Sequence, residues 1–173
     1  AYTTFWLVNA PTGQKWVRVG DASLLSKNDY VIGPCDGLFV RPRVGTVNLG
    51  AAGQVRSWDM VCPLKTGVNF VGNPFPMAMS PASRNMTVAG GFKGGANANL
   101  ADKFNFWSGD ASSSTTYVTY YLFKNVSIER WLRAGDAALT DRTNELLFPP
   151  TTAAFMTSIL GHSTWLIPSP WTP

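Results

Sequence analysis

The sequence predicts an all-β protein, either an antiparallel sandwich or a barrel, and three observations lead to that prediction. Short runs of aromatic and β-branched residues alternate along the chain with Gly, Pro, Asn and Asp, which is typical of strands and turns. Helical periodicity is weak throughout, so we expect short helical turns only. The stretch WVRVGDASLL, which begins at Trp16, returns as WLRAGDAALT from Trp131. This third observation predicts an internal duplication.

Each expected strand is a short apolar run that ends near a turn-forming residue. Stretches that begin with Asp or contain several Pro are the candidates for helical turns, and Asp21 and Asp136 stand where a carboxylate caps such a turn. The expected strands are residues 3–9, 15–21, 37–44, 68–76, 103–110, 115–123, 130–136 and 153–159, and the expected helical turns are 21–29, 73–83 and 136–145.

The duplication extends well beyond the ten matching residues. Residues 3–50 repeat 118–166, first at an offset of 115 and then of 116. The repeating unit, about 115 residues from one copy to the next, is too long for a solenoid repeat and indicates a domain-sized module. We therefore expect residues 1–57 to be an incomplete first copy and 58–173 a complete second copy, packed with the first as one unit.

The repeated Trp-x-Arg-x-Gly-Asp element predicts the same local structure in both copies. Trp16 and Trp131 are expected to fill equivalent buried pockets. The two glycines, Gly20 and Gly135, allow a turn at positive φ, and the carboxylates of Asp21 and Asp136 accept hydrogen bonds from the backbone N–H groups of that turn.

Composition narrows the function classes. Charged residues make up 14% of the chain, against about 25% in a typical soluble domain. The net charge of +4 comes from scattered Lys and Arg, so the basic patch expected of a nucleic-acid-binding protein is missing. No apolar run approaches the ~20 residues of a membrane span. We expect an extracellular or cell-surface protein without nucleic-acid partners.

The two cysteines, Cys35 and Cys62, are expected to form a disulfide, because paired cysteines are typical of exported proteins. Each lies beside a proline-containing bend, in GPCDG and VCPLK. The alternative is a pair of buried free thiols.

The second copy also resembles a known family. GVNFVGNPFP, a glycine-rich stretch, ADKFNFW, TTYVTYYLF and RWLRAGD are similar to motifs of secreted β-rich proteins of Verrucomicrobia and Planctomycetes, which carry Gly-Asn-Pro-(Phe/Tyr)-Pro and have no established activity. The resemblance covers residues 58–171. It implies a secreted, β-rich, non-catalytic protein.

The chain contains no motif that predicts an enzyme. His162 is the only histidine, Gly-x-Ser-x-Gly is missing, and GGFKGG lacks the Gly-Lys-Ser/Thr ending of a phosphate-binding loop. Carboxylates are scattered and form no calcium-binding run. We therefore expect no catalytic residue, no cofactor and no metal site.

Two non-enzymatic functions remain. The first is a structural protein that self-assembles into a filament, sheath or surface layer, with Phe5, Trp6 and Leu7 joining identical protomers because the first copy has no strands upstream to cover them. The alternative is a carbohydrate-binding or adhesin module that uses exposed Trp and Tyr, with a surface polysaccharide as its partner. A solvent-facing aromatic row favours the second function.

Overall fold

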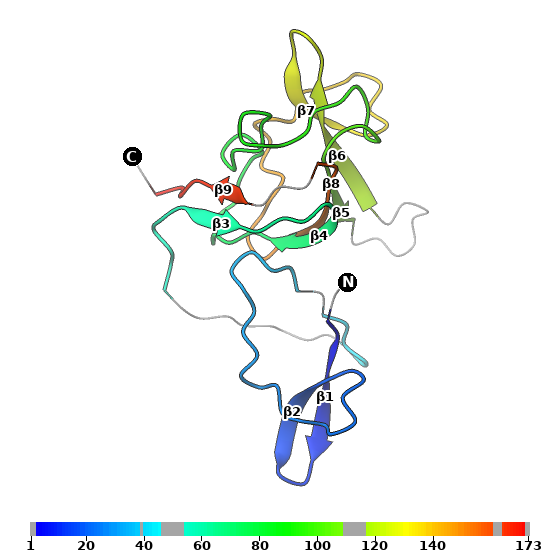
Figure 1. Cartoon of the computed structure of the whole chain (residues 1–173), viewed down its shortest axis with the longest axis vertical. Helices are drawn as coiled ribbons and strands as arrows, with labels where there is room; N and C mark the ends of the chain where they lie inside the picture. Colours follow the sequence, from blue (N-terminus) through cyan, green and yellow to red (C-terminus); the bar gives the residue numbers. More distant parts are fainter. Residues whose placement is uncertain (1–2, 39, 46–53, 109–116, 161–163, 172–173) are drawn as a thin grey trace. The chain divides into compact units, whose positions relative to one another are not determined.

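A computed structural model describes residues 3–38, 40–45, 54–108, 117–160 and 164–171. The chain forms two compact units, Ala1–Gly33 and Pro34–Pro173 (Figure 1). All strand pairs in the described residues are antiparallel, and these residues contain no helix, which confirms the all-β prediction.

The first unit is built on a hairpin of β1 (Phe5–Ala10) and β2 (Gly13–Arg18). Its register runs from Phe5 opposite Arg18 to Ala10 opposite Gly13, which leaves a two-residue turn. Gly13 closes this turn at a φ of 111°, a conformation that glycine adopts without strain.

The second unit contains a five-stranded sheet and a separate two-stranded sheet (Figure 1). The order of the larger sheet is β4-β8-β5-β6-β7, and β3 pairs with β9. The strands are β3 (Met60–Cys62), β4 (Gly67–Gly72), β5 (Lys103–Trp107), β6 (Tyr117–Lys124), β7 (Glu129–Arg133), β8 (Ala153–Ser158) and β9 (Trp165–Ile167).

Sequence prediction and structure differ at three places. The short strands β3 and β9 were not expected, because three residues are too few to show alternation. The strand expected at residues 37–44 appears among its described residues only as an edge contact, in which Gly37 donates to the Phe70 carbonyl beside the bridge from Asp36 to Val71. None of the three expected helical turns forms a helix. In residues 21–29 and 136–145, Leu24 and Leu139 have φ values of 48° and 49°, which interrupt the helical conformation.

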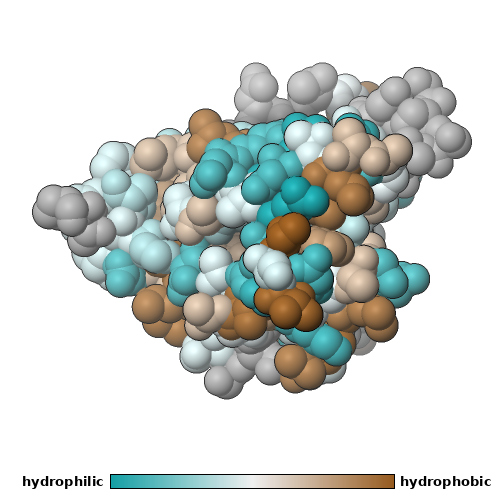
Figure 2. Space-filling view, turned by 90° about the horizontal axis from the view of Figure 1, so that it is seen from above, coloured by the Kyte–Doolittle hydropathy of each residue, from teal (hydrophilic) through white to brown (hydrophobic). Residues whose placement is uncertain are grey.

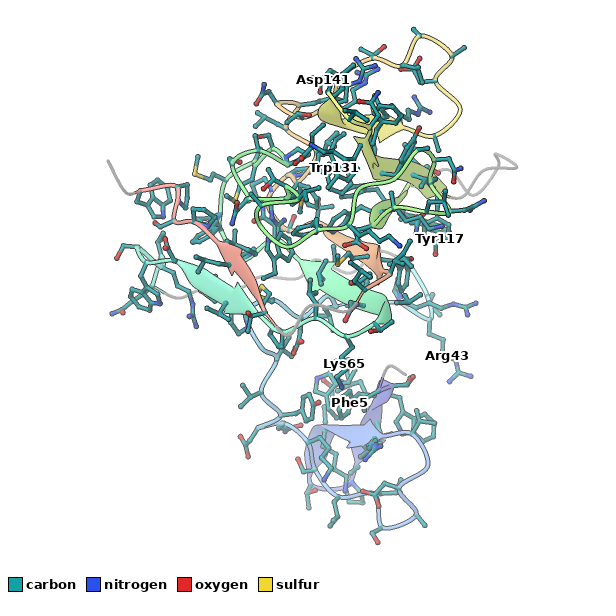
Figure 3. All side chains as sticks on the ribbon, turned by 45° about the horizontal axis from the view of Figure 1, so that its top comes forward. Phe5, Arg43, Lys65, Tyr117, Trp131 and Asp141 are labelled. Carbon is teal, nitrogen blue, oxygen red and sulfur yellow. A yellow bond between two sulfur atoms is a disulfide. The ribbon has the colours of Figure 1, made fainter. Side chains whose placement is uncertain are left out.

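The larger core of the second unit lies on one face of the five-stranded sheet, and a smaller buried cluster of Ala101, Tyr121 and Leu132 lies on the other. Phe104, Leu122, Trp131 and Met156 project from the first face and are fully buried; Trp131 is labelled in Figure 3. The segment 84–86 crosses this core and is held by two indole N–H groups. Trp165 Nε1 donates to the Arg84 carbonyl at 2.8 Å, and Trp131 Nε1 donates to the Met86 carbonyl at 2.7 Å.

Arg84 is an unusual member of this core because its side chain is 0% exposed. The guanidinium lies 4.3 Å from the Phe148 ring centroid and 4.6 Å from that of Trp165. Nη2 donates to the Gly72 carbonyl at 3.4 Å, whereas Nε and Nη1 have no hydrogen-bond partner among the described residues. Burial lowers the pKa of Arg84 to about 9, because a charged group loses its hydration there. The two aromatic faces partly replace that hydration.

The Gly-Asn-Pro-Phe-Pro stretch forms a turn organised by Asn73. Its amide Nδ2 donates to the Met77 and Phe148 carbonyls, at 2.9 Å each, and its Oδ1 accepts from the Phe75 N–H at 3.1 Å. One side chain thus shapes the turn and joins it to a segment 75 residues later in the chain.

A disulfide joins Cys35 to Cys62, as predicted. The adjacent segment pairs with the outer edge of β4, where Gly72 donates to the Cys35 carbonyl at 3.0 Å. These bonds make residues 35–37 part of the second unit. The structure therefore divides the chain before Pro34, not after residue 57 where the sequence places the end of the first copy.

Replacing both cysteines with alanine should lower the free energy of unfolding of the second unit by about 3 kcal/mol, because the bond closes a loop of 27 residues. Urea unfolding followed by circular dichroism measures this loss. The same midpoint for both proteins would contradict the expectation.

Arg84→Met should raise the free energy of unfolding by about 1–2 kcal/mol, because it removes an incompletely paired buried charge and keeps a side chain of similar length. Arg84→Ala should lower it, since this variant also leaves a cavity between Phe148 and Trp165. Urea unfolding of both variants distinguishes the effect of removing the buried charge from the effect of losing the side-chain contacts. A destabilised Met variant would show that the aromatic contacts outweigh the cost of desolvation.

Candidate functional site

The hairpin of the first unit matches the β6–β7 hairpin of the second, residue for residue. Leu7 lies opposite Trp16 in β1–β2, and Leu122 lies opposite Trp131 in β6–β7. Every pair described for β6–β7 has its counterpart 115 residues earlier. The register is therefore identical over five successive pairs, from 120 with 133 to 124 with 129.

The turns after the two hairpins share one hydrogen-bond pattern. Gly20 and Gly135 have φ values of 86° and 83°, as the sequence predicts. Asp21 Oδ1 accepts from the Ser23 N–H at 3.0 Å, and Asp136 Oδ1 accepts from the Ala138 N–H at 2.9 Å. The chain then returns, so that Lys27 N–H donates to the Trp16 carbonyl and Arg142 N–H to that of Trp131, both at 2.8 Å.

The second of these turns carries an additional charge interaction. The pKa of Asp136 lies below its ordinary value, first because the Thr140 side chain donates to its carboxylate and then because backbone N–H groups do so. Arg142 Nη2 lies 3.8 Å from Asp136 Oδ2. These are the contacts of a structural turn that stabilises an ionised carboxylate, and they leave Asp136 without the features of a proton donor at neutral pH.

The two tryptophans do not occupy equivalent buried pockets, so that prediction is wrong. Trp131 is 1% exposed, whereas Trp16 is 44% exposed. Trp131 is covered by the rings of Phe92 and Phe104, whose centroids lie 6.4 Å and 5.6 Å from its own. Both rings come from the segment that precedes β6, and the described part of the first unit has no counterpart of that segment.

The outer edge of β1 differs from that of β6 in the same way. Because Val19 N–H donates to the Thr4 carbonyl, the alternation of an antiparallel pair directs the backbone groups of Phe5, Leu7 and Asn9 away from β2. Among the described residues, β2 is the only strand that pairs with β1. This leaves what we call the open edge of β1, at residues 5, 7 and 9.

The corresponding positions of β6 are fully used. Leu122 N–H donates to the Asp102 carbonyl at 3.1 Å, its carbonyl accepts from Gly95 N–H at 3.0 Å, and Lys124 N–H donates to the Gly95 carbonyl at 3.1 Å. Tyr120 lies opposite Phe104 of β5. The same edge is therefore paired in the β6–β7 hairpin and, among the described residues, unpaired in the β1–β2 hairpin.

The three residues predicted for assembly lie on this strand and differ in exposure. Leu7 is 48% exposed, whereas its counterpart Leu122 is 1% exposed. Trp6 also projects into solvent, and Phe5 is half-buried with its ring 4.6 Å from that of Tyr30. Leu7 and Trp16 lie opposite one another and form an exposed apolar surface beside the open edge.

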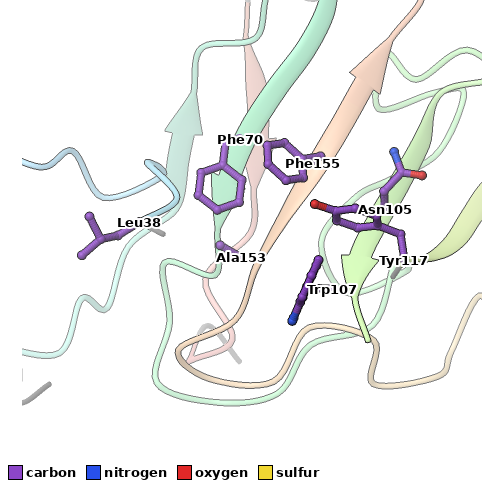
Figure 4. A pocket seen from close by; sticks show the side chains of 7 residues that line it. All are labelled: Leu38, Phe70, Asn105, Trp107, Tyr117, Ala153 and Phe155. Atoms are coloured by element: carbon purple, nitrogen blue, oxygen red, sulfur yellow. The ribbon is translucent and has the colours of Figure 1, made fainter. Parts of the chain in front are cut away.

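A second surface, not predicted from the sequence, lies on the five-stranded sheet. It is a shallow groove with a cavity volume of about 160 Å³, which we call the aromatic groove (Figure 4). Trp107 was not singled out from the sequence, although alternation along β5 directs it to the face opposite the buried Phe104 and could have indicated it. The pairing of β5 with β8 could not be seen in the sequence. The groove is lined by Leu38, Phe70, Asn105, Trp107, Tyr117, Ala153 and Phe155.

Other apolar side chains are dispersed over the surface. Figure 2 shows several separate apolar patches among polar residues on the face that it presents. Within the described residues, no three His, Cys, Asp or Glu side chains gather as a metal site would require, and no helix has the length and apolar character to cross a membrane. His162 lies outside the described residues.

No family model, curated protein or solved structure matches the chain. The resemblance to secreted proteins of Verrucomicrobia and Planctomycetes thus stays a prediction.

Gly135→Ala should lower the free energy of unfolding by about 1–2 kcal/mol, because a β-carbon is disfavoured at a φ of 83°, although no atom beyond the adjacent residues lies within 4 Å of where it would stand. Gly135→Asn should cost less, since Asn tolerates positive φ. Chemical unfolding of both variants checks the order. An Ala variant as stable as the Asn variant would contradict it.

Proposed function

We propose that this chain is a secreted structural protein that self-assembles into an extracellular filament, sheath or surface layer, with protomers joined by strand addition at the open edge of β1. The observation that carries this proposal is the contrast between β1 and β6, whose hairpins have one register but whose outer edges differ in partner. Natural proteins rarely leave a strand edge and an adjoining apolar surface uncovered.

The energetics favour a protein partner for this surface. Completely burying a side chain the size of Leu contributes about 1.5–3 kcal/mol, and Leu7 and Trp16 are each only about half covered. Strand addition also pairs the backbone groups of Phe5, Leu7 and Asn9. A head-to-tail contact of this kind continues into a polymer unless its rotation closes a ring.

Two further features support the proposal, one for an extracellular setting and one for contact between protomers. Disulfides persist in oxidising compartments, and Cys35 and Cys62 form one here. The low proportion of charged side chains is compatible with close contact between identical protomers.

Sedimentation velocity at increasing protein concentration should show association of the parent chain that Leu7→Lys prevents, because a buried Lys at the contact would be charged and unpaired. Leu146→Lys is the matched control, since Leu146 is also an exposed leucine and lies far from β1 in the sequence. Electron microscopy of the associated material then shows whether it is a regular polymer.

Leu7→Pro tests the hydrogen-bonding part of the proposal. It removes an N–H that points away from β2, so the hairpin keeps its own bonds while the open edge loses a donor. This variant should also remain unassociated. A parent chain that stays monomeric, or a Leu7→Lys variant that polymerises like the parent, would refute assembly through β1.

A further inference from the structure

The aromatic groove has an architecture of its own, independent of the open edge of β1. Phe70, Phe155, Asn105 and Thr119 are successive cross-strand partners and form one row across β4, β8, β5 and β6. Trp107 and Tyr117 face each other two residues further along β5 and β6, on the same face of the sheet. Between these aromatic residues the sheet carries only Gly72 and Ala153, which lie opposite one another. The hollow exists because these two side chains are small.

The walls of the groove are held in place by their neighbours. The Phe70 and Phe155 rings stack at 4.6 Å with an interplanar angle of 29°. Tyr117 stands nearly perpendicular to both Phe155 and Trp107, at centroid distances of 5.9 Å and 5.3 Å. On the far side of Phe70 lies Gly37, where a β-carbon would come within 2.5 Å of the ring. The rings are therefore arranged before any ligand arrives.

Polar groups occur at two defined points among the rings. Thr119 Oγ1 donates to Asn105 Oδ1 at 2.8 Å, which orients the amide. Within the part of the chain that the structure describes, Nδ2 makes no hydrogen bond, so its two N–H donors can serve a ligand. Figure 4 shows the Tyr117 hydroxyl directed toward the other rings rather than away from them. None of the lining residues carries a charge.

These features select among the possible occupants. A purely apolar occupant would cover the Asn105 amide and the Tyr117 hydroxyl without pairing them, which is unfavourable. An ionic ligand would find no counter-charge among the lining side chains. A pyranose ring has a C–H face that stacks on the electron-rich face of an aromatic ring, and its rim of hydroxyls pairs with amide and phenol groups.

We propose that the aromatic groove is a binding site for a neutral polysaccharide, with one pyranose ring seated over Ala153 against Trp107 and its hydroxyls paired with Asn105 and Tyr117. The proposed ligand is an uncharged sugar chain. It stands whether or not the chain polymerises through β1, and a protein with both properties would attach its assembly to a glycan surface.

The test is isothermal titration calorimetry of the full chain with four neutral oligosaccharides: cellohexaose, xylohexaose, mannohexaose and chitohexaose. Hexagalacturonate is the charged comparison. At least one neutral oligosaccharide should bind, and hexagalacturonate should bind more weakly than that ligand. Trp107→Ala should weaken binding at least tenfold. Asn105→Ala should weaken it about three- to tenfold, the value of one hydrogen bond.

Two further variants keep the result interpretable. Ala153→Leu fills the aromatic groove and should abolish binding while the far-ultraviolet circular dichroism stays that of the parent. Trp58→Ala is the matched control, since Trp58 is an exposed tryptophan outside the groove, and it should leave the affinity unchanged.

Several outcomes would overturn the proposal. These are no binding of any of the four neutral oligosaccharides, tighter binding of hexagalacturonate, or an affinity that Trp107→Ala and Ala153→Leu leave unchanged. If the sugars fail and Trp107→Ala instead reduces sedimentation of the parent assembly, the groove is occupied by a second copy of the chain and the sugar site is refuted. Leu7→Lys, which tests assembly, should leave sugar binding intact.

Discussion

The structure of the second unit depends on two buried indole N–H groups, which donate to backbone carbonyls two residues apart. Trp131 reaches Met86 from β7, and Trp165 reaches Arg84 from β9, so an irregular segment becomes the point where both sheets meet. Phe92 and Phe104 then close around the indoles. Buried tryptophan requires an acceptor for its N–H, and here that requirement determines where a segment without regular structure must lie.

The two hairpins show that local structure and burial have separate causes in this chain. A Gly at positive φ, followed by an Asp whose carboxylate accepts from the backbone of the turn, accompanies the same register and the same return of the chain in both hairpins. Neither depends on whether the tryptophan is covered. Burial is decided instead by residues far away in the sequence, which supply Phe92 and Phe104 to Trp131 and nothing equivalent within the described first unit to Trp16.

This distinction explains how much of the structure could be predicted. Strands β1, β2 and β4 to β8 were visible as short aromatic and β-branched runs, and the Gly-Asp turns followed from residue chemistry. The disulfide followed from the cysteine count. What could not be predicted was strand order: β8 lies between β4 and β5 although Phe155 follows Phe70 by 85 residues, and no local pattern reports such a pairing. The aromatic groove depends on that order, so only its individual aromatics, and not their meeting over Ala153, were within reach of the sequence.

The position of the disulfide has a mechanical consequence. Cys35 is the second residue of the second unit, and its partner Cys62 ends β3 within the core. A pulling force applied through the first unit would pass from Pro34 across the sulfur–sulfur bond directly into β3. The 27-residue separation between the cysteines is thereby excluded from the extensible length, which would otherwise add roughly 90 Å of chain. The disulfide therefore carries the applied force covalently, close to where the chain passes from the first unit to the second, and the residues between the two cysteines bear none of it.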